Sequence, residues 1–458
     1  MTSQTDKGAE LERTLTSRQL SMIVIGGAIG TGLFLGSGDA IGRAGPAVIL
    51  AFLLGALLAL ALAYALGEMS TARPVAGGFG TLTHRYLGPT AGFTHRWAYW
   101  VAQVINIGSE ATAILIYLQY WWPGLPGWVP IVAATAVVLG LNLFPVRVFG
   151  ESEYWLTAVK ITTIVAFVGI GLLVVVFGLP SQPSPGLEYW TEPLGFAPNG
   201  LSGVWLAMVT VVFSYMGTEA LSMTAAESRR PDRDIPRATR RTVFRLALFY
   251  LLTIAVIISL QPADQADADS GLTESPFVSA LGAVGLPAAA TIINLVVLVA
   301  ALSAMNTNLY VASRMLFGMA RSGHAPGLLG GLHRGRPWPA LAASSAGLLL
   351  AAGMSVLAPA DAFALLISLS LFNALASWIF IFGTHLAYRR VEGRDIRDGP
   401  AIRLRAPTVT AILAIVVLGA IMVTMLFVDE FQLAPIAGGV FLAGMASAYA
   451  FVRRRRRS

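Results

Sequence analysis

Long apolar runs alternate with short polar stretches along almost the whole 458-residue chain. Each run reaches the roughly 20 residues that a helix needs to cross a bilayer, so the pattern predicts twelve membrane-spanning helices. Their approximate bounds are 19–42, 45–71, 92–120, 128–146, 152–178, 201–226, 242–261, 287–318, 338–358, 362–388, 408–428 and 433–452. Charged residues make up only 12% of the chain, whereas a soluble domain carries roughly 25%. The sequence therefore predicts an all-α polytopic membrane protein.

Basic residues gather in every second connection between the expected spans. With the N-terminus inside, the inner connections contain Arg73, Arg85, Arg96, Arg147, "RRPDRDIPRATRR", Arg321, Arg334, Arg336, "RRVEGRDIRDGPAIRLR" and the terminal "RRRRR". The long outer connections, "GLPSQPSPGLEYWTEPLGFAPNG" and "QPADQADADSGLTESP", contain acidic residues and no Lys or Arg. By the positive-inside rule, this pattern predicts an even number of spans, with both termini in the cytoplasm. We expect a multi-pass protein of the cytoplasmic membrane.

The remaining composition excludes several other classes of protein. The net charge of +7 is explained by topology and by contact with lipid headgroups, so we expect membrane lipid and no nucleic acid as a partner. The N-terminal stretch lacks the apolar region and cleavage site of a removable signal peptide. The chain has no cysteine and only five histidines, none of them in a metal-binding pair such as HExxH. We expect no metal, no cofactor, no enzymatic activity and no ATP-driven pumping.

Glycines interrupt the first expected span. The stretch "MIVIGGAIGTGLFLGSG", residues 22–38, contains six glycines, although glycine weakens a helix and a helix in lipid must satisfy its own backbone hydrogen bonds. A similar element lies in the sixth span, where "MGTE" at Met216–Glu219 parallels "IGTG" at Ile29–Gly32. Five spans separate the two, and an odd number reverses the direction across the membrane. This arrangement predicts an inverted repeat with paired interrupted helices around a midplane binding site.

The repeat divides the chain into five parts. They are a cytoplasmic N-terminal segment at 1–18, a first repeat of spans 1–5 at 19–200, a second repeat of spans 6–10 at 201–400, spans 11 and 12 at 401–452, and a basic cytoplasmic tail at 453–458.

The interruptions indicate the kind of substrate. If a helix stops at Gly26–Gly27 and resumes near Gly32, the N–H groups of the second half lack helical partners and can bind a carboxylate. The half-helix dipole favours the same anion. Freed carbonyls of the first half, and of Phe213 and Ser214 in span 6, can accept from an ammonium group. Such a site fits an amino acid. The alternative, that the glycines only allow close helix packing, leaves the matching interruption in span 6 unexplained.

Candidate substrate contacts lie at the two interruptions or on polar positions of other spans. They are Ile25, Gly26, Ala28, Gly30, Thr31, Gly32, Glu110, Phe213, Ser214, Tyr215, Gly217 and Asn306. The carboxylate would meet the N–H groups of Gly30, Thr31 and Gly32. The amine would meet carbonyls from both interruptions.

Several segments together resemble the amino acid permeases of the amino acid–polyamine–organocation (APC) superfamily. They are "GGAIGTGLFLGSG", "AGPAVILAFLLGALLALALAYALGEMSTARP", "IYLQYWWPGLPGW", "VFGESEYWLTAVKI", "FSYMGTEALSMTAAES" and "NLYVASRMLFGMARSGHAP". The resemblance covers nearly the whole chain and is nearest the permeases for 4-aminobutyrate (GABA), lysine and aromatic amino acids in the amino acid transporter (AAT) branch. It implies the five-plus-five fold of the leucine transporter, with spans 11 and 12 outside that core. It also implies uptake by alternating access, usually coupled to protons, with spans 1, 2, 6 and 7 moving against the rest.

Lys160, about a third of the way into span 5, is the candidate for proton coupling. A charge at this depth costs about 3 kcal/mol on insertion scales, so it indicates a function. Desolvation disfavours the charged form of a lysine and so suits it to release a proton. The resemblance implies that Lys160 takes the place of a sodium ion found in related transporters. The alternative is a lysine that extends to the cytoplasmic surface.

Three glutamates complete the set of candidates. Glu110, deep in span 3, is expected to contact the substrate amine or to carry the proton, with a structural carboxyl as the alternative. Glu219 follows the interruption in span 6 and is expected to stabilise it or shape the site. Glu68, near the cytoplasmic end of span 2, is expected to act in gating or packing.

The sequence favours a neutral amino acid as the substrate, because neutral and apolar residues dominate the expected lining. Aromatic or cationic amino acids and 4-aminobutyrate remain open. Proton-coupled symport is the expected mechanism, with amino acid exchange or a GABA permease as the alternative. A channel or a transporter-like nutrient sensor is a more distant alternative, and only flux measurements separate these classes.

Overall fold

The computed structural model describes residues 15–75, 77–180, 183–224, 228, 230–264, 275–333, 335–357, 362–393 and 402–455. Residues 1–14 of the expected N-terminal segment and 456–458 of the basic tail lie outside the described residues, as do Arg334 and parts of both arginine-rich connections.

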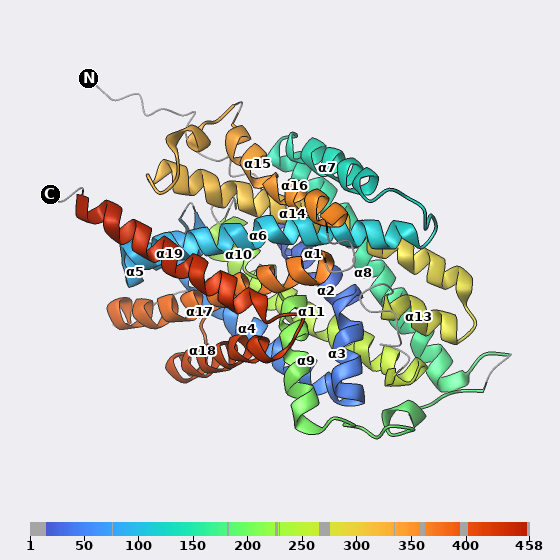
Figure 1. Ribbon diagram of the computed structural model, residues 1–458. Helices are drawn as coiled ribbons and strands as arrows, with labels where there is room; N and C mark the ends of the chain where they lie inside the picture. Colours follow the sequence, from blue (N-terminus) through green and yellow to red (C-terminus); the bar gives the residue numbers. More distant parts are fainter. Residues whose placement is uncertain are drawn as a thin grey trace.

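The described residues form a bundle of α-helices (Figure 1). In chain order they are α1 (Ser17–Ala28), α2 (Thr31–Phe34), α3 (Gly36–Ala44), α4 (Val48–Ala72), α5 (Gly78–Leu87), α6 (Pro89–Gln119), α7 (Trp128–Asn142), α8 (Val146–Phe177), α9 (Gly200–Ser214), α10 (Ala220–Thr224), α11 (Pro231–Leu260), α13 (Pro276–Ala283), α14 (Pro287–Arg321), α15 (Trp338–Ser344), α16 (Ala346–Leu357), α17 (Ala362–Glu392), α18 (Pro407–Thr424) and α19 (Leu433–Arg455). Short 3-10 helices are η1 (Gly45–Ala47), η2 (Glu188–Trp190), η5 (Gly327–Gly330) and η7 (Met425–Phe427).

Eight helical stretches within the described ranges are long and apolar enough to cross a membrane. They are Gly36–Ala72, Pro89–Gln119, Val146–Phe177, Pro231–Leu260, Thr291–Arg321, Ala364–Glu392, Pro407–Phe427 and Leu433–Phe451. The prediction of an all-α protein rich in apolar helices is confirmed. The other four expected spans fall mainly on shorter helices: the first on α1 and α2, with its end on the α3 part of Gly36–Ala72, the fourth on α7, the sixth on α9 and α10, and the ninth on α15 and α16.

The start of α11 corrects one expectation. The segment "IPRATRR" was assigned to a connection before a span at 242–261, but the helix already begins at Pro231. A proline fits the first turn because its missing N–H is not needed there, and Asp232 and Asp234 complement the helix dipole in the same turn. The Asp234 carboxylate also accepts the N–H of Arg230 at 3.2 Å. The arginines therefore lie on helical turns. The short helices α5 and α13 likewise replace expected connections.

α6 lies at the centre of the bundle. It packs against α14, α16 and α17, and α1 packs against α8, α11 and α14 (Figure 1). In the most apolar windows, 72% of α6 residues are buried, against 28% for α18 and 11% for α19. The last two helices therefore lie at the periphery of the bundle.

Two helices stop at the positions where glycines interrupt the pattern. α1 ends at Ala28 and α2 begins at Thr31, with Gly30 extended at φ −131° and ψ −154°. α9 ends at Ser214 and α10 begins at Ala220, with Gly217 at φ 96°. A left-handed φ suits glycine and strains other residues.

Candidate functional site

The two interruptions lie against each other. A Cβ atom on Gly217 would stand 2.6 Å from the carbonyl of Gly27, and one on Gly32 would stand 2.8 Å from the Cα of Ser214. Only glycine allows such an approach of one backbone to another. The interruption between α1 and α2 is thus in direct backbone contact with the one between α9 and α10.

Tyr250 of α11 connects the two interruptions. Its buried hydroxyl lies 2.8 Å from the carbonyl oxygen of Ala28 and 2.7 Å from that of Ser214. A hydroxyl has one proton, so it donates to one of these carbonyls at a time. The sequence analysis did not identify Tyr250, because a tyrosine in an apolar run has no signal that sets it apart from packing residues.

Lys160 of α8 reaches the end of α1. Its side chain is fully buried, and Nζ donates to the carbonyl oxygens of Gly26 at 2.6 Å and Ile29 at 2.8 Å. The side chain therefore does not extend to the surface, as the alternative required. The ammonium group takes up carbonyls that the end of a helix leaves free.

Each carbonyl expected to meet the substrate amine has a donor from within the protein. Gly26 accepts from Lys160, and Ser214 lies within reach of Tyr250. The carbonyls of Ile25 and Phe213 accept the N–H groups of Ile29 at 2.8 Å and Met216 at 3.1 Å. A carbonyl oxygen has a second lone pair, so a substrate ammonium would share these acceptors with protein donors.

Glu153 is a buried carboxylate that the sequence analysis missed. It lies on α8 and accepts from the hydroxyl of Ser303 and from Nδ2 of Asn306 at 2.9 Å. A Cβ on Gly26 would overlap its Oε1, so any larger residue there would displace the Glu153 side chain where α1 passes α8. The signal was present in "ESEYWLTAVK", because Glu153 and Lys160 are seven residues apart and share a helical face.

Asn306 belongs to this polar group, because its Oδ1 accepts from Nδ2 of Asn142 on α7 at 2.8 Å. Glu153 lies beside Gly26, whose carbonyl accepts from Lys160, and Glu110 lies beside Gly30. Buried polar groups on α6, α7, α8 and α14 therefore converge on the end of α1.

Glu110 of α6 lies beside the interruption between α1 and α2. Its Oε1 accepts the hydroxyl of Thr31 at 3.1 Å, and a Cβ on Gly30 would stand 2.7 Å from the same oxygen. Within the described part of the chain, its buried Oε2 has no hydrogen-bond partner. A buried polar atom without a partner is costly, so this oxygen is a candidate to bind a proton or a ligand.

Glu219 stabilises the turn between α9 and α10. Its carboxylate accepts the N–H of Gly217 at 3.2 and 3.1 Å, and the hydroxyl of Tyr99 donates to it at 3.3 Å. Tyr215, by contrast, donates its hydroxyl to the carbonyl of Phe52 on α4 at 2.8 Å. Its ring therefore faces α4.

Glu68 takes part in a separate cluster at the end of α4. It forms an ion pair with Arg389 at 2.8 Å, lies 3.2 Å from Nε2 of His385, and accepts the N–H of Leu404 at 3.1 Å. This cluster joins α4 to α17 and to the start of the segment before α18. The structure does not bring Glu68 together with the residues at the interruptions.

A bundle of apolar helices with buried polar groups around two interruptions is the architecture of a polytopic membrane transporter. The family model for amino acid permeases matches residues 19–454, and the chain belongs to this family, as the resemblance implied. The protein is therefore an integral membrane protein that transports amino acids. It is not an enzyme, and permeases of this family generally work without a cofactor. No group of three metal-ligating side chains occurs among the described residues.

Three relatives illustrate the similarity. The uncharacterized amino acid permeases YvbW and YtnA of Bacillus subtilis are 36% and 33% identical, over 94% and 96% of this chain and 95% of each relative. The aromatic amino acid transport protein AroP of Escherichia coli K12 is 37% identical, over 84% of this chain and 83% of AroP.

Proposed function

We propose that the protein imports an amino acid across the cytoplasmic membrane by alternating access, as a symport with protons. The observation that carries the proposal is the pair of hydrogen bonds from Lys160 to the carbonyls of Gly26 and Ile29. A protonated lysine ties the end of α1 to α8. A neutral amine has one donor fewer and no charge, so loss of the proton would weaken this tie and allow α1 to move.

The proposed topology is twelve spans with both termini in the cytoplasm. Spans 1–5 at 19–200 and spans 6–10 at 201–400 would form the inverted repeat, with spans 11 and 12 outside it. The interruptions at Gly30 and Gly217 would then be breaks in spans 1 and 6 near the midplane. The contacts between these two interruptions support this arrangement.

The proposed substrate site lies at these breaks. N–H groups of Thr31 and Gly32 would bind the carboxylate, whereas the N–H of Gly30 already donates to the carbonyl of Ala28 at 3.1 Å. The unpartnered oxygen of Glu110 would meet the amine or a second proton. Carbonyls from both breaks would complete the amine site. The side-chain pocket would be mainly apolar, which favours a neutral amino acid.

Aromatic amino acids are the first neutral substrates to test, because 84% of this chain aligns with the aromatic amino acid transport protein AroP at 37% identity. Exchange of internal for external amino acid is the second candidate mechanism. It uses the same site and needs no net proton movement.

The test is uptake of radiolabelled amino acids into proteoliposomes with and without an inward proton gradient. The variants are Lys160→Ala and, as a control for loss of a cation, Arg147→Ala at an exposed position of the same helix. Symport predicts accumulation driven by the gradient in the wild type and the control, and only equilibration in Lys160→Ala. A wild type that ignores the gradient and exchanges substrate would contradict the symport proposal.

A further inference from the structure

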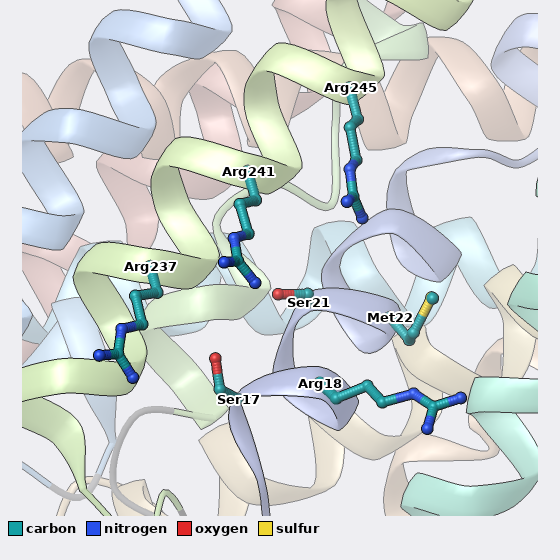
Figure 2. A pocket seen from close by; sticks show the side chains of 7 residues that line it. All are labelled: Ser17, Arg18, Ser21, Met22, Arg237, Arg241 and Arg245. Atoms are coloured by element: carbon teal, nitrogen blue, oxygen red, sulfur yellow. The ribbon is translucent and has the colours of Figure 1, made fainter.

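A basic cleft lies between the first turns of α1 and the N-terminal half of α11. Its volume is about 460 Å³, and Arg237, Arg241 and Arg245 of α11 line it together with Ser17 and Ser21 of α1. Figure 2 shows the three arginines along one side of α11 with the serines across from them. Among the described residues that line the cleft, none is acidic. The described lining of the cleft therefore carries positive charge and no carboxylate.

The spacing of the three arginines makes this charge unfavourable for the free protein. They are four residues apart on one helical face, where like charges repel each other. All three are exposed, and none forms an ion pair with a described carboxylate. A bound anion would remove the repulsion and accept bidentate hydrogen bonds from the guanidinium groups.

Arg18 forms the far wall of the cleft and is held in place by α8. Its guanidinium lies 3.9 Å from the centre of the Tyr154 ring and donates to the Tyr154 hydroxyl. Figure 2 shows this side chain extending away from the three arginines. The opening between them is therefore not filled by Arg18, and its charge still contributes to the field in the cleft.

An apolar surface follows the three arginines along α11. Leu248 and Leu252 are 41% and 38% exposed, and they lie three and seven residues after Arg245, on the same helical face. A few residues from the arginines the helix thus presents apolar side chains to its surroundings. An anion with hydrocarbon chains attached would bind both the arginines and the apolar side chains. A free anion would bind only the arginines.

We infer that this cleft binds the phosphate group of an anionic phospholipid, with the acyl chains along Leu248 and Leu252. The phosphate oxygens accept from Arg237, Arg241 and Arg245, and the hydroxyls of Ser17 and Ser21 donate from α1. The lipid thereby connects the start of α1 to α11. The assignment of this lipid to the inner leaflet rests on the proposed function, because the cytoplasmic side was inferred there.

The test measures lipid binding in detergent, so that it depends neither on orientation nor on transport. The thermal unfolding midpoint of the purified protein is titrated with dioctanoyl phosphatidylglycerol, with dioctanoyl phosphatidylcholine and with inorganic phosphate. Phosphatidylglycerol is expected to raise the midpoint saturably, and the other two are not. In R237Q/R241Q/R245Q, half-saturation is expected to need at least about tenfold more phosphatidylglycerol, which is the loss of roughly one charge-assisted hydrogen bond.

The matched control is R85Q/R147Q/R321Q, which removes the same charge from three other exposed arginines and is expected to bind like the wild type. If the glutamine variant does not fold, R237K/R241K/R245K takes its place, because it keeps the charge but not the bidentate fork. Half-saturation is then expected to shift several-fold.

Three results would overturn the assignment. If phosphatidylglycerol raises the unfolding midpoint equally in the cleft variant and the control, the lipid binds the basic surface as a whole and not the cleft. An equal response to phosphatidylcholine would remove the role of charge, and an equal response to inorganic phosphate would assign the cleft to a soluble anion. Failure of proton-coupled uptake would leave all of these binding results unchanged, so the two proposals are tested separately.

Discussion

Glu153 and Lys160 are buried two helical turns apart on α8, and their partners differ. The carboxylate accepts side-chain donors from α14, whereas the ammonium donates to the backbone of α1. Removing the Glu153 carboxyl group would leave its buried donors, the Ser303 hydroxyl and the Asn306 amide, without their acceptor, which is costly. At the scale of single residues, loss of this carboxyl group is therefore expected to destabilise the protein.

We expect Glu153→Gln to lower the free energy of unfolding by about 1–3 kcal/mol, the cost of a buried donor without its acceptor, and to abolish gradient-driven uptake. The amide would direct N–H groups at the donors Ser303 and Asn306. Thermal unfolding in detergent and uptake into proteoliposomes measure the two effects. Glu151→Gln, an exposed carboxylate on the same helix, should change neither. A Glu153→Gln variant with wild-type stability and uptake would show that the buried charge is dispensable.

Tyr250→Phe tests the connection between the two interruptions. Loss of the hydroxyl removes one hydrogen bond, worth about 1 kcal/mol, so we expect roughly a fivefold higher KM for the transported amino acid in a folded protein. Initial rates of uptake at varied substrate concentration provide the measurement. Tyr120→Phe, at an exposed tyrosine, is the control. An unchanged KM would mean that the hydroxyl does not hold the substrate site.

At the scale of elements, the interruptions depend on backbone conformations that only a few residues adopt. The chain between α9 and α10 turns through Gly217 in the left-handed region, directly against the carbonyl of Gly27. The Glu219 carboxylate then accepts the N–H of Gly217, which would otherwise lack a partner within a helix. The backbone conformation of Gly217, its close contact with Gly27 and its hydrogen bond to Glu219 all stabilise the same turn.

Gly217→Ala should be strongly disruptive. Strain in the left-handed region costs about 1–3 kcal/mol, and the added Cβ would also overlap the Gly27 carbonyl. We expect a lower unfolding midpoint and loss of uptake. Gly419→Ala in α18 is the matched control, because nothing lies within 4 Å of the added Cβ. Comparable stability of the two variants would argue against a rigid contact between the interruptions.

At the scale of the whole molecule, the ends of distant helices are tied together by charged and polar groups. The Glu68 cluster joins α4 to α17. Beyond it, Glu392 at the end of α17 pairs with Arg73 and accepts the Tyr86 hydroxyl of α5. Burial, with the hydrogen bond to Glu392, raises the pKa of Tyr86 to about 12. These contacts hold α5 against the end of the bundle.

His84 on α5 makes the stability of this end depend on pH. Burial, and then the charge of Arg96, lower the pKa of His84 below its ordinary value of about 6.5. The unfolded chain therefore binds this proton more readily than the folded protein, and stability is lost as pH falls below about 6.5. We expect the unfolding midpoint to fall less steeply with acid in His84→Asn than in the wild type.

His333→Asn, at an exposed histidine, controls for loss of an imidazole. The midpoint is measured in detergent from pH 8 downward for all three proteins. Identical profiles for the wild type and His84→Asn would contradict a role for His84 in acid sensitivity.

The sequence by itself determined which segments are apolar helices, where the two interruptions fall, and which family the chain belongs to. These features follow from local properties: the length of each apolar run, the weak helix propensity of glycine, and short motifs. Lys160 was identified for the same reason, because a charge in an apolar run stands out without knowledge of its neighbours.

Only the tertiary structure decided which groups meet. Glu153 was overlooked because it falls at the edge of an apolar run, and only the packing of α8 against α14 buries it among donors. Tyr250 was missed because hydrogen bonding to distant backbone carbonyls carries no local hydropathy signal. The start of α11 was missed because charged residues interrupt its hydropathy, although Pro231, Asp232 and Asp234 are local signals of a helix start. The Gly26 carbonyl, expected to meet a substrate amine, already accepts from Lys160, since the free carbonyls at the end of a helix take the nearest donor that the folded chain supplies.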